Sequence, residues 1–228
     1  MELMTRHVQA CYAHDDAGNI VRINDWIGNA APRFWLGRTP EGSIWRFRRD
    51  VPPSVRAEIE ASCREEPRCT GEPRPPLHDS TYRRLLGEDD AGLDVVAGPT
   101  YWFRRAVRAH GDVARITEEN RDLLRDGLEA WLPDVPHQQP MVVSLHAGRA
   151  VSICASVRIT PQAHEAGVET VPAFRRRGHA LAAAAAWATA VMALGRVALY
   201  STSWDNRASQ AVAARLGLEA FGQEYRIG

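Results

Sequence analysis

The sequence predicts an α/β (α+β) fold, on three observations. Short runs of β-branched and aromatic residues, separated by glycine and proline turns, predict several short strands. An alanine-rich run at 180–194 closely follows a β-branched run at 168–171, which predicts a strand, a turn and a helix. Apolar residues make up 45% of the 228 residues, enough to bury an ordinary core.

Residues 1–110 show structural signals but no chemical motif. The runs 33–38 and 43–47 flank Thr39-Pro-Glu-Gly42, and proline second with glycine fourth suits the tight turn of a β-hairpin. Alternation puts Phe34 and Leu36 on one face of this hairpin and Trp35 on the other, so either two-sided packing or a free aromatic face fits. The other expected elements are a turn at 15–18, a strand at 20–23, a helix at 54–66, an exposed irregular stretch at 67–80, a helical turn at 81–86 and a strand at 95–103 interrupted at Gly98-Pro99.

Residues 112–228 follow a more regular order. Thr117 is a good N-cap, which predicts a helix to about Leu132, with Leu124 and Trp131 among its core positions. The expected order is β-α-β-β-β-α-β-α-β, over 112–116, 117–132, 141–146, 150–158, 165–171, 178–194, 197–201, 206–216 and 221–227.

Composition excludes several classes of protein. The formal net charge is zero, which argues against broad attraction to nucleic acid, and all 28 basic residues are arginine. The four cysteines are too sparse for a disulfide framework, and Cys11-x-x-His14 has no matching second half, so we expect no metal. The longest uncharged run, 180–195, is shorter than a membrane span, and no signal peptide is apparent. We expect a cytoplasmic protein with no membrane partner.

One stretch predicts an anion-binding site. The β-branched run ends at Pro172, and Arg175, Arg176, Arg177 and Gly178 then lead into the alanine-rich helix. The first amides of a helix have no intrahelical acceptor and lie at the positive end of its dipole. Glycine also lets an anion approach the backbone. The free N–H groups would be those of His179, Ala180 and Leu181. The alternative is an ordinary solvated turn, and the strand–helix context favours the anion site.

This stretch resembles the pyrophosphate motif of the GNAT acetyltransferase superfamily, Gln/Arg-x-x-Gly-x-Gly/Ala, which here reads Arg175 to Ala180. The family also places a valine-rich strand and a proline before the motif, as with Val171 and Pro172. A second GNAT-like signature follows, with Asn206, Ser209 and Leu216-Gly-Leu218 at the family's spacings. The resemblance covers about residues 112–228.

The resemblance carries implications for fold and ligand. It implies a mixed, mostly antiparallel sheet flanked by helices in a catalytic domain at 111–228, with an α+β region at 1–110 expected to cover the substrate side, shape its pocket or complete the sheet. It implies acetyl-CoA as co-substrate, bound by the pyrophosphate turn, by the backbone around Thr170 and Val171, and by Asn206 and Ser209. The expected activity is transfer of an acetyl group to a small-molecule or peptide amine.

Two glutamates are the candidate proton acceptors. Glu165 and Glu169 share one face of the strand at 165–171, and a carboxylate there can take the proton that an attacking amine loses. A solvated edge or a structural ion pair fits this placement equally well. Many family members carry a tyrosine acid seven residues after the asparagine, where this chain has Ala213. An inactive acyl-CoA-binding module is therefore the alternative function.

Overall fold

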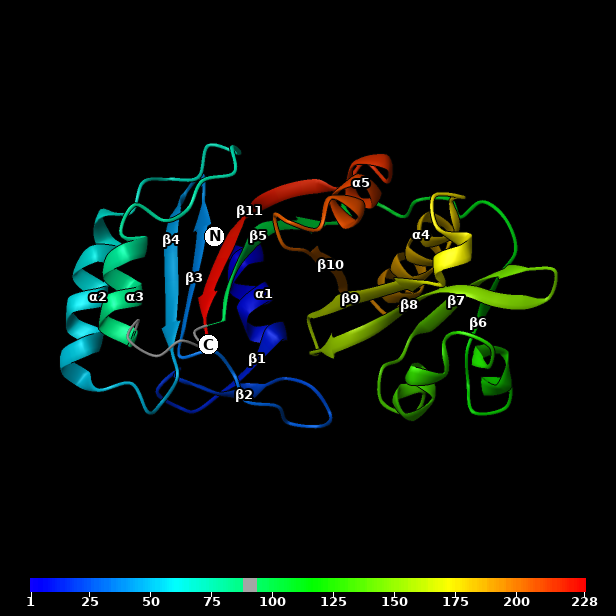
Figure 1. Cartoon of the computed structure of the whole chain (residues 1–228), viewed down its shortest axis with the longest axis horizontal. Helices are drawn as coiled ribbons and strands as arrows, with labels where there is room; N and C mark the ends of the chain where they lie inside the picture. The colour runs from blue at the N-terminus through cyan, green and yellow to red at the C-terminus, as the bar shows by residue number, and fades with distance from the viewer. Residues whose placement is uncertain (88–93) are drawn as a thin grey trace. The chain divides into compact units, whose positions relative to one another are not determined.

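A computed structural model describes residues 1–87 and 94–228, which divide into two units (Figure 1). The first unit contains Met1–Tyr101, Ser201–Arg207 and Ala220–Gly228, and the second contains Trp102–Tyr200 and Ala208–Glu219. The chain therefore passes from one unit to the other several times, and the final strand belongs to the first unit. None of the helices in the described residues is both long enough and apolar enough to cross a membrane.

The first unit places helices against a sheet whose strands run in the order β4-β3-β11-β5. β3 pairs antiparallel with both β4 and β11. A separate two-stranded sheet joins β1 to β2. The elements are α1 (Glu2–Cys11), β1 (Tyr12–His14), β2 (Ile20–Ile23), β3 (Phe34–Thr39), β4 (Gly42–Phe47), α2 (Pro53–Glu65), α3 (Asp79–Leu86), β5 (Val95–Trp102) and β11 (Glu219–Ile227).

Both faces of β3 are buried, which decides between the two interpretations of the hairpin. Phe34 and Leu36 join a core cluster with residues of α2, α3 and β11. Trp35 points to the opposite face and packs in a second cluster with Met4 and Val8 of α1. The aromatic residues of β3 therefore pack on both sides of the strand, and neither Phe34 nor Trp35 is exposed. The turn itself is held by Thr39, whose Oγ1 accepts hydrogen bonds from the N–H groups of residues 41 and 42.

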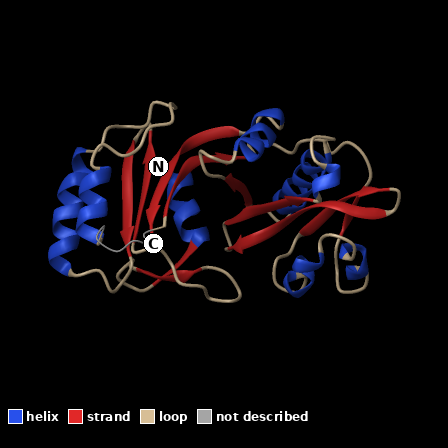
Figure 2. Cartoon of the chain, in the orientation of Figure 1, coloured by secondary structure: helices blue, strands red, loops and turns tan. Residues whose placement is uncertain are grey.

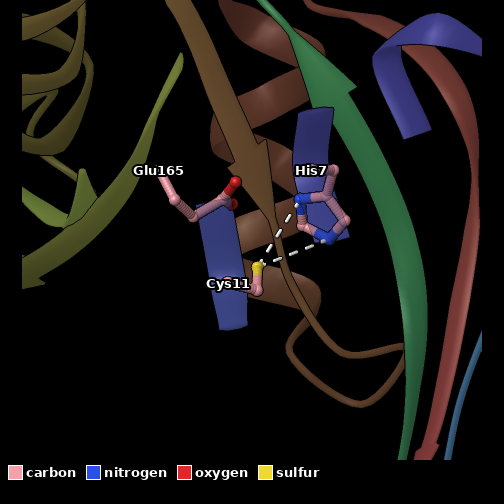
Figure 3. A group of neighbouring side chains, drawn as sticks. All are labelled: His7, Cys11 and Glu165. Atoms are coloured by element: carbon pink, nitrogen blue, oxygen red, sulfur yellow. Dashed lines mark hydrogen bonds between the residues drawn. The ribbon is translucent and has the colours of Figure 1, made fainter. Parts of the chain in front are cut away.

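A buried polar group lies between α1 and the sheet. The Glu224 carboxylate is 3.1 Å from His7 Nε2 and accepts a hydrogen bond from Trp35 Nε1, also at 3.1 Å. Cys11 follows His7 by one helical turn, and its sulfur lies 3.8 Å from each ring nitrogen (Figure 3). The neighbour of Cys11 in this unit is therefore His7, one turn earlier on the same helix.

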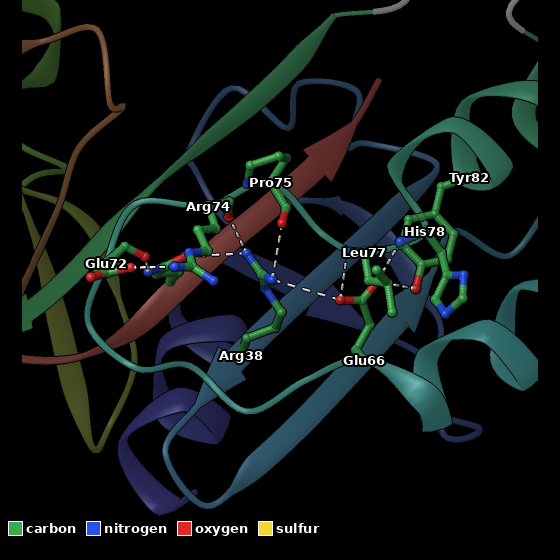
Figure 4. Close-up of polar contacts among 9 residues, drawn as sticks. Arg38, Glu66, Glu72, Arg74, Pro75, Leu77, His78 and Tyr82 are labelled. Atoms are coloured by element: carbon green, nitrogen blue, oxygen red, sulfur yellow. Dashed lines mark hydrogen bonds and ion pairs between the residues drawn. The ribbon is translucent and has the colours of Figure 1, made fainter.

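The stretch at 67–78 is exposed along most of its side chains, as expected, but the backbone of its second half is anchored by two buried side chains (Figure 4). The Arg38 guanidinium donates to the carbonyl oxygens of Arg74 and Pro75. The Glu66 carboxylate accepts the N–H groups of Leu77 and His78 at 2.9 and 3.0 Å. An irregular segment is thereby fixed to the sheet by two buried charges.

The second unit has the strand order β10-β9-β8-β7-β6, in which β10 is parallel to β9 and the other pairs are antiparallel (Figure 2). The long helix α4 packs on β7, β8 and β9. Five of its seven buried residues are alanine, and the other two are Trp187 and Val191. The elements are β6 (Val113–Arg115), η1 (Arg121–Leu124), η2 (Glu129–Asp134), β7 (Met141–His146), β8 (Arg149–Ile159), β9 (Ala163–Thr170), η3 (Pro172–Phe174), α4 (His179–Ala193), β10 (Val197–Ser201) and α5 (Arg207–Arg215).

The predicted α/β class with a mostly antiparallel sheet is confirmed, while some elements differ. The helix expected at 117–132 is replaced by η1 and η2, because Asp126 and Gly127 both adopt positive φ between them. Thr117 does not cap a helix, since its N–H donates to the Asn120 side chain. β5 is not interrupted: although Pro99 lacks an N–H, its carbonyl accepts a hydrogen bond from Thr202 N–H. The helix α1 was not expected.

Candidate functional site

The turn between β9 and α4 has a backbone that only certain residues adopt readily. Arg176 has φ +62°, and Gly178, the N-cap of α4, has φ +92°. A side chain on Gly178 would meet no other atom within 4 Å. Glycine is thus required here by conformation, since the space in front of it is open. An incoming anion could reach the backbone at this point.

The amide groups of this turn are available for a ligand. Among the described residues, none accepts a hydrogen bond from the N–H groups of residues 176–181, and Ala182 is the first to bond, to the Gly178 carbonyl at 3.1 Å. These amides include those of His179, Ala180 and Leu181, as the sequence predicted. Aligned amides without acceptors, here at the positive end of a 15-residue helix, are an arrangement at which anions commonly bind.

The three arginines surround the turn and are exposed. Arg175 Nε donates to the Thr170 carbonyl at 3.2 Å, and the Arg177 guanidinium lies 5.5 Å from the centre of the Phe174 ring. No ion pair within the described part of the chain involves Arg175, Arg176 or Arg177. Their positive charge is therefore not neutralised by a neighbouring carboxylate.

His179 is the first residue of α4, and its side chain contacts residues of β7 and η3. Its Nδ1 shares a hydrogen bond of 2.9 Å with Ser144 Oγ of β7. Its ring makes edge contacts with His146 and Phe174. Burial, then the neighbouring His146 and Arg177, lower the pKa of His179 below its usual range. The Ser144 contact ties the start of α4 to β7.

β9 leads to this turn with one open edge. It pairs with β10 only over Ala163–Glu165, and beyond that no described strand follows the same edge. Val171 N–H donates to the Val151 carbonyl of β8, so alternation turns the backbone groups of Val168 and Thr170 toward the open edge. Val171 differs from expectation, because its carbonyl also accepts the Phe174 N–H and both of its backbone groups are engaged.

The two candidate proton acceptors on β9 have different surroundings. Glu165 is 4% exposed, whereas Glu169 is exposed at the open end of the strand. The Glu169 carboxylate accepts a hydrogen bond from Trp131 Nε1 of η2, at 2.6 Å between nitrogen and Oε2. Sequence reasoning placed Trp131 only in the core, and no signal in the sequence indicates this contact.

The second signature surrounds the start of α5. Asn206 is exposed immediately before the helix, and its N–H donates to the Ser203 carbonyl. Ser209 Oγ is 2.7 Å from the hydroxyl of Tyr200 on β10. Ala213 is fully buried on the helix, so this position presents no side chain to solvent. Tyr225 is buried in the first unit and donates to Asp79.

The turn and the strands that frame it lie within a recognised sequence family. Residues 142–227 match the sequence profile of the family described as GNAT acetyltransferase. This segment belongs to the GNAT superfamily. The GNAT segment thus includes β9, the arginine turn, α4, and both residues of the second signature. No curated protein matches the chain.

Solved structures with GNAT descriptions are similar to the chain at low identity. A GCN5-related N-acetyltransferase-like protein from Streptococcus suis is 16% identical, over 87% of this chain and 85% of that chain, with a TM-score of 0.49. A GNAT-family acetyltransferase from Colwellia psychrerythraea is 14% identical, over 85% and 81% of the two chains, with a TM-score of 0.48. A putative GNAT acetyltransferase from Novosphingobium aromaticivorans is 17% identical, over 60% and 67%, with a TM-score of 0.48.

Proposed function

We propose that the protein is an N-acyltransferase that transfers an acetyl group from acetyl-CoA to an amine. The observation that carries the proposal is the turn at 175–181, with its unpaired amides, three exposed arginines and open space before Gly178. These features fit a pyrophosphate, which needs several N–H donors and positive charge at one place. The open edge at Val168 and Thr170 leads directly to this turn and offers amide partners to an extended arm.

The residues of β9 supply what the transfer requires. Acetyl-CoA, when bound, supplies a thioester carbonyl that an amine can attack. The amine nitrogen forms the new N–C bond as the C–S bond breaks, and the amine must lose a proton to do so. Glu169, exposed at the open end of β9, is placed to accept that proton directly or through water.

The leaving group does not require an acid on α5. A thiol has a reference pKa of about 8.5, so the departing thiolate is tolerable near neutral pH. This accounts for activity with alanine at position 213. The same alanine favours the second candidate function, an acyl-CoA-binding module without turnover. We propose that residues 111–228 form the catalytic domain and that residues 1–110 form part of the site for the acceptor amine.

Calorimetry with acetyl-CoA tests the phosphate site. Gly178→Val should weaken binding at least about tenfold, since losing one charge-assisted hydrogen bond changes affinity by that order. Gly195→Val is the matched control, because Gly195 ends the same helix, also has positive φ and also faces open space. Both variants carry similar backbone strain. Equal affinity of the two variants for acetyl-CoA would refute the phosphate site.

Turnover separates the two functions. Thiol release from acetyl-CoA is measured with a panel containing an amino acid, a polyamine, an aminoglycoside and a peptide with a free N-terminus. We expect at least one amine to raise thiol release above the rate without amine. Acetyl-CoA binding with no release for any amine would favour the binding module.

A further inference from the structure

Trp131 and Glu169 form a contact between an irregular segment and β9. Trp131 lies on η2 and is partly buried, while Glu169 is exposed near the end of the strand. The indole nitrogen is 2.6 Å from Oε2 of the carboxylate. Among the described residues, no other side chain donates to this carboxylate and no ion pair includes it. One oxygen is therefore held, and Oε1 is left to accept a proton.

The place of the indole ring is set by glycine on the same face of β9. A Cβ on Gly167 would lie 3.2 Å from Cη2 of Trp131 and 2.2 Å from a methyl carbon of Val157. The absence of a side chain at this residue thus lets the ring lie against the strand. A second glycine fits the same segment to the chain beyond β9, since a Cβ on Gly127 would be 3.0 Å from a methyl of Val171. The segment thus lies close to the chain of β9 at two points, and the ring is at the first of them.

The nearby acid on η2 is engaged elsewhere. The Glu129 carboxylate accepts the N–H groups of Asp126 and Gly127 at 2.7 and 2.9 Å. It therefore closes the turn between η1 and η2. Both oxygens of Glu129 thus accept backbone N–H groups, whereas Glu169 has one oxygen, Oε1, left for a substrate.

We propose that Trp131 is the positioning residue of Glu169: its indole N–H holds Oε2 so that Oε1 receives the proton of the acceptor amine, and its ring forms a wall beside that amine. The inference rests on the proposed function, in which Glu169 is the base. The indole N–H holds one carboxylate oxygen in place, which restricts rotation of the base. A fixed base also loses less rotamer freedom during transfer.

The first test removes the N–H and keeps an aromatic ring. Initial rates of thiol release are measured with acetyl-CoA and the fastest amine of the panel. In Trp131→Phe, kcat should fall by about tenfold while the KM for acetyl-CoA is unchanged, because the carboxylate is no longer held in one orientation. Trp187→Phe is the control: it removes an indole donor to Ser156 in the same unit, and its kcat should not change.

A double variant assigns the effect to the carboxylate. Glu169→Gln should lower turnover by about 10²–10⁴-fold with acetyl-CoA affinity retained. Adding Trp131→Phe to Glu169→Gln should then cause no further loss. If Trp131→Phe keeps the wild-type kcat, or if the two losses multiply, Trp131 only packs and the inference is wrong.

An NMR titration tests the contact without a variant of Trp131. The indole N–H resonance of Trp131 should shift as Glu169 titrates, and Glu169→Gln should abolish that shift. A pH-independent resonance in the wild type would overturn the positioning role. Full turnover in Glu169→Gln would refute the proposed base, even if the wild-type indole resonance still shifts with pH.

Discussion

Glu66→Gln should destabilise the first unit strongly, because the side chain joins several buried donors. Its carboxylate accepts hydrogen bonds from the N–H groups of Leu77 and His78 and from the Tyr82 hydroxyl, at 2.9–3.0 Å. The Arg38 guanidinium lies 3.6 Å away, and both side chains are almost inaccessible to water. Glutamine has nearly the same shape, but it has no charge and only one acceptor oxygen. Its NH₂ group would face N–H and O–H donors to which it cannot bond.

The magnitude follows from the charge and the lost acceptor. Breaking a buried charged pair by removing one partner costs about 3–5 kcal/mol. Each hydrogen bond to a charged acceptor contributes about 1.5–3 kcal/mol, and glutamine loses at least one of them. Arg38 keeps its bonds to the carbonyls of residues 74 and 75, which limits the loss. We expect the free energy of unfolding to fall by about 3–5 kcal/mol, a large part of the 5–15 kcal/mol that is typical of a domain.

Equilibrium urea denaturation at neutral pH measures this change, with Glu72→Gln as the control. Glu72 lies in the same segment and forms an ion pair with Arg74 at 2.6 Å, but both side chains are mostly exposed. An exposed pair contributes about 0–1 kcal/mol. The reasoning is refuted if the two variants unfold at the same urea concentration with the same slope.

Two further predictions concern the first unit. Burial raises the pKa of Glu224, but the hydrogen bond and charge of His7, together with Arg226 and the Trp35 hydrogen bond, outweigh it and lower the pKa to about 2. This carboxylate therefore stabilises the fold above its ordinary pKa, and about 3 kcal/mol of the free energy of unfolding is lost as pH falls from about 4.5 to 2. Glu224→Gln should make the free energy of unfolding less dependent on pH in that window. An unchanged dependence on pH would contradict the prediction. A chain beginning near Gly111 lacks β3, the partner of β11. Size-exclusion chromatography should show it aggregated, and the thiol-release assay should show it inactive. A soluble monomer with wild-type turnover would show residues 1–110 to be dispensable.

Local sequence signals predicted the strand, turn and helix of the candidate site. The arginine turn is readable because a proline, a glycine and a helix start follow a strand within a few residues, so the geometry is set by neighbours in the chain. The hairpin at β3 and β4 and the helix α4 were predictable for the same reason. Both glutamates were expected on one face, yet only the structure shows that Glu165 is buried and Glu169 exposed.

What could not be predicted depends on contacts between distant residues. Trp131 and Glu169 are 38 positions apart and meet only because the segment before β7 breaks at Asp126 and Gly127. A tryptophan at helical spacing usually packs in the core, so the sequence pattern does not indicate the hydrogen bond of its indole N–H. Pairing of β11 with β3 is likewise invisible, since any strand with suitable alternation could fill that position.

The pairing of β3 with β11 also constrains the order in which the protein can form during synthesis. Trp35 and Glu224 bond to each other although they are 189 positions apart. The first unit therefore cannot close its sheet until residues 223–227 have been translated and have left the ribosome, whereas β6 to β9 pair with near neighbours. At about 5–20 residues per second, the apolar surface of β3 waits for roughly 10 to 40 seconds. The early part of the chain is thus the part that most needs protection from aggregation while translation continues.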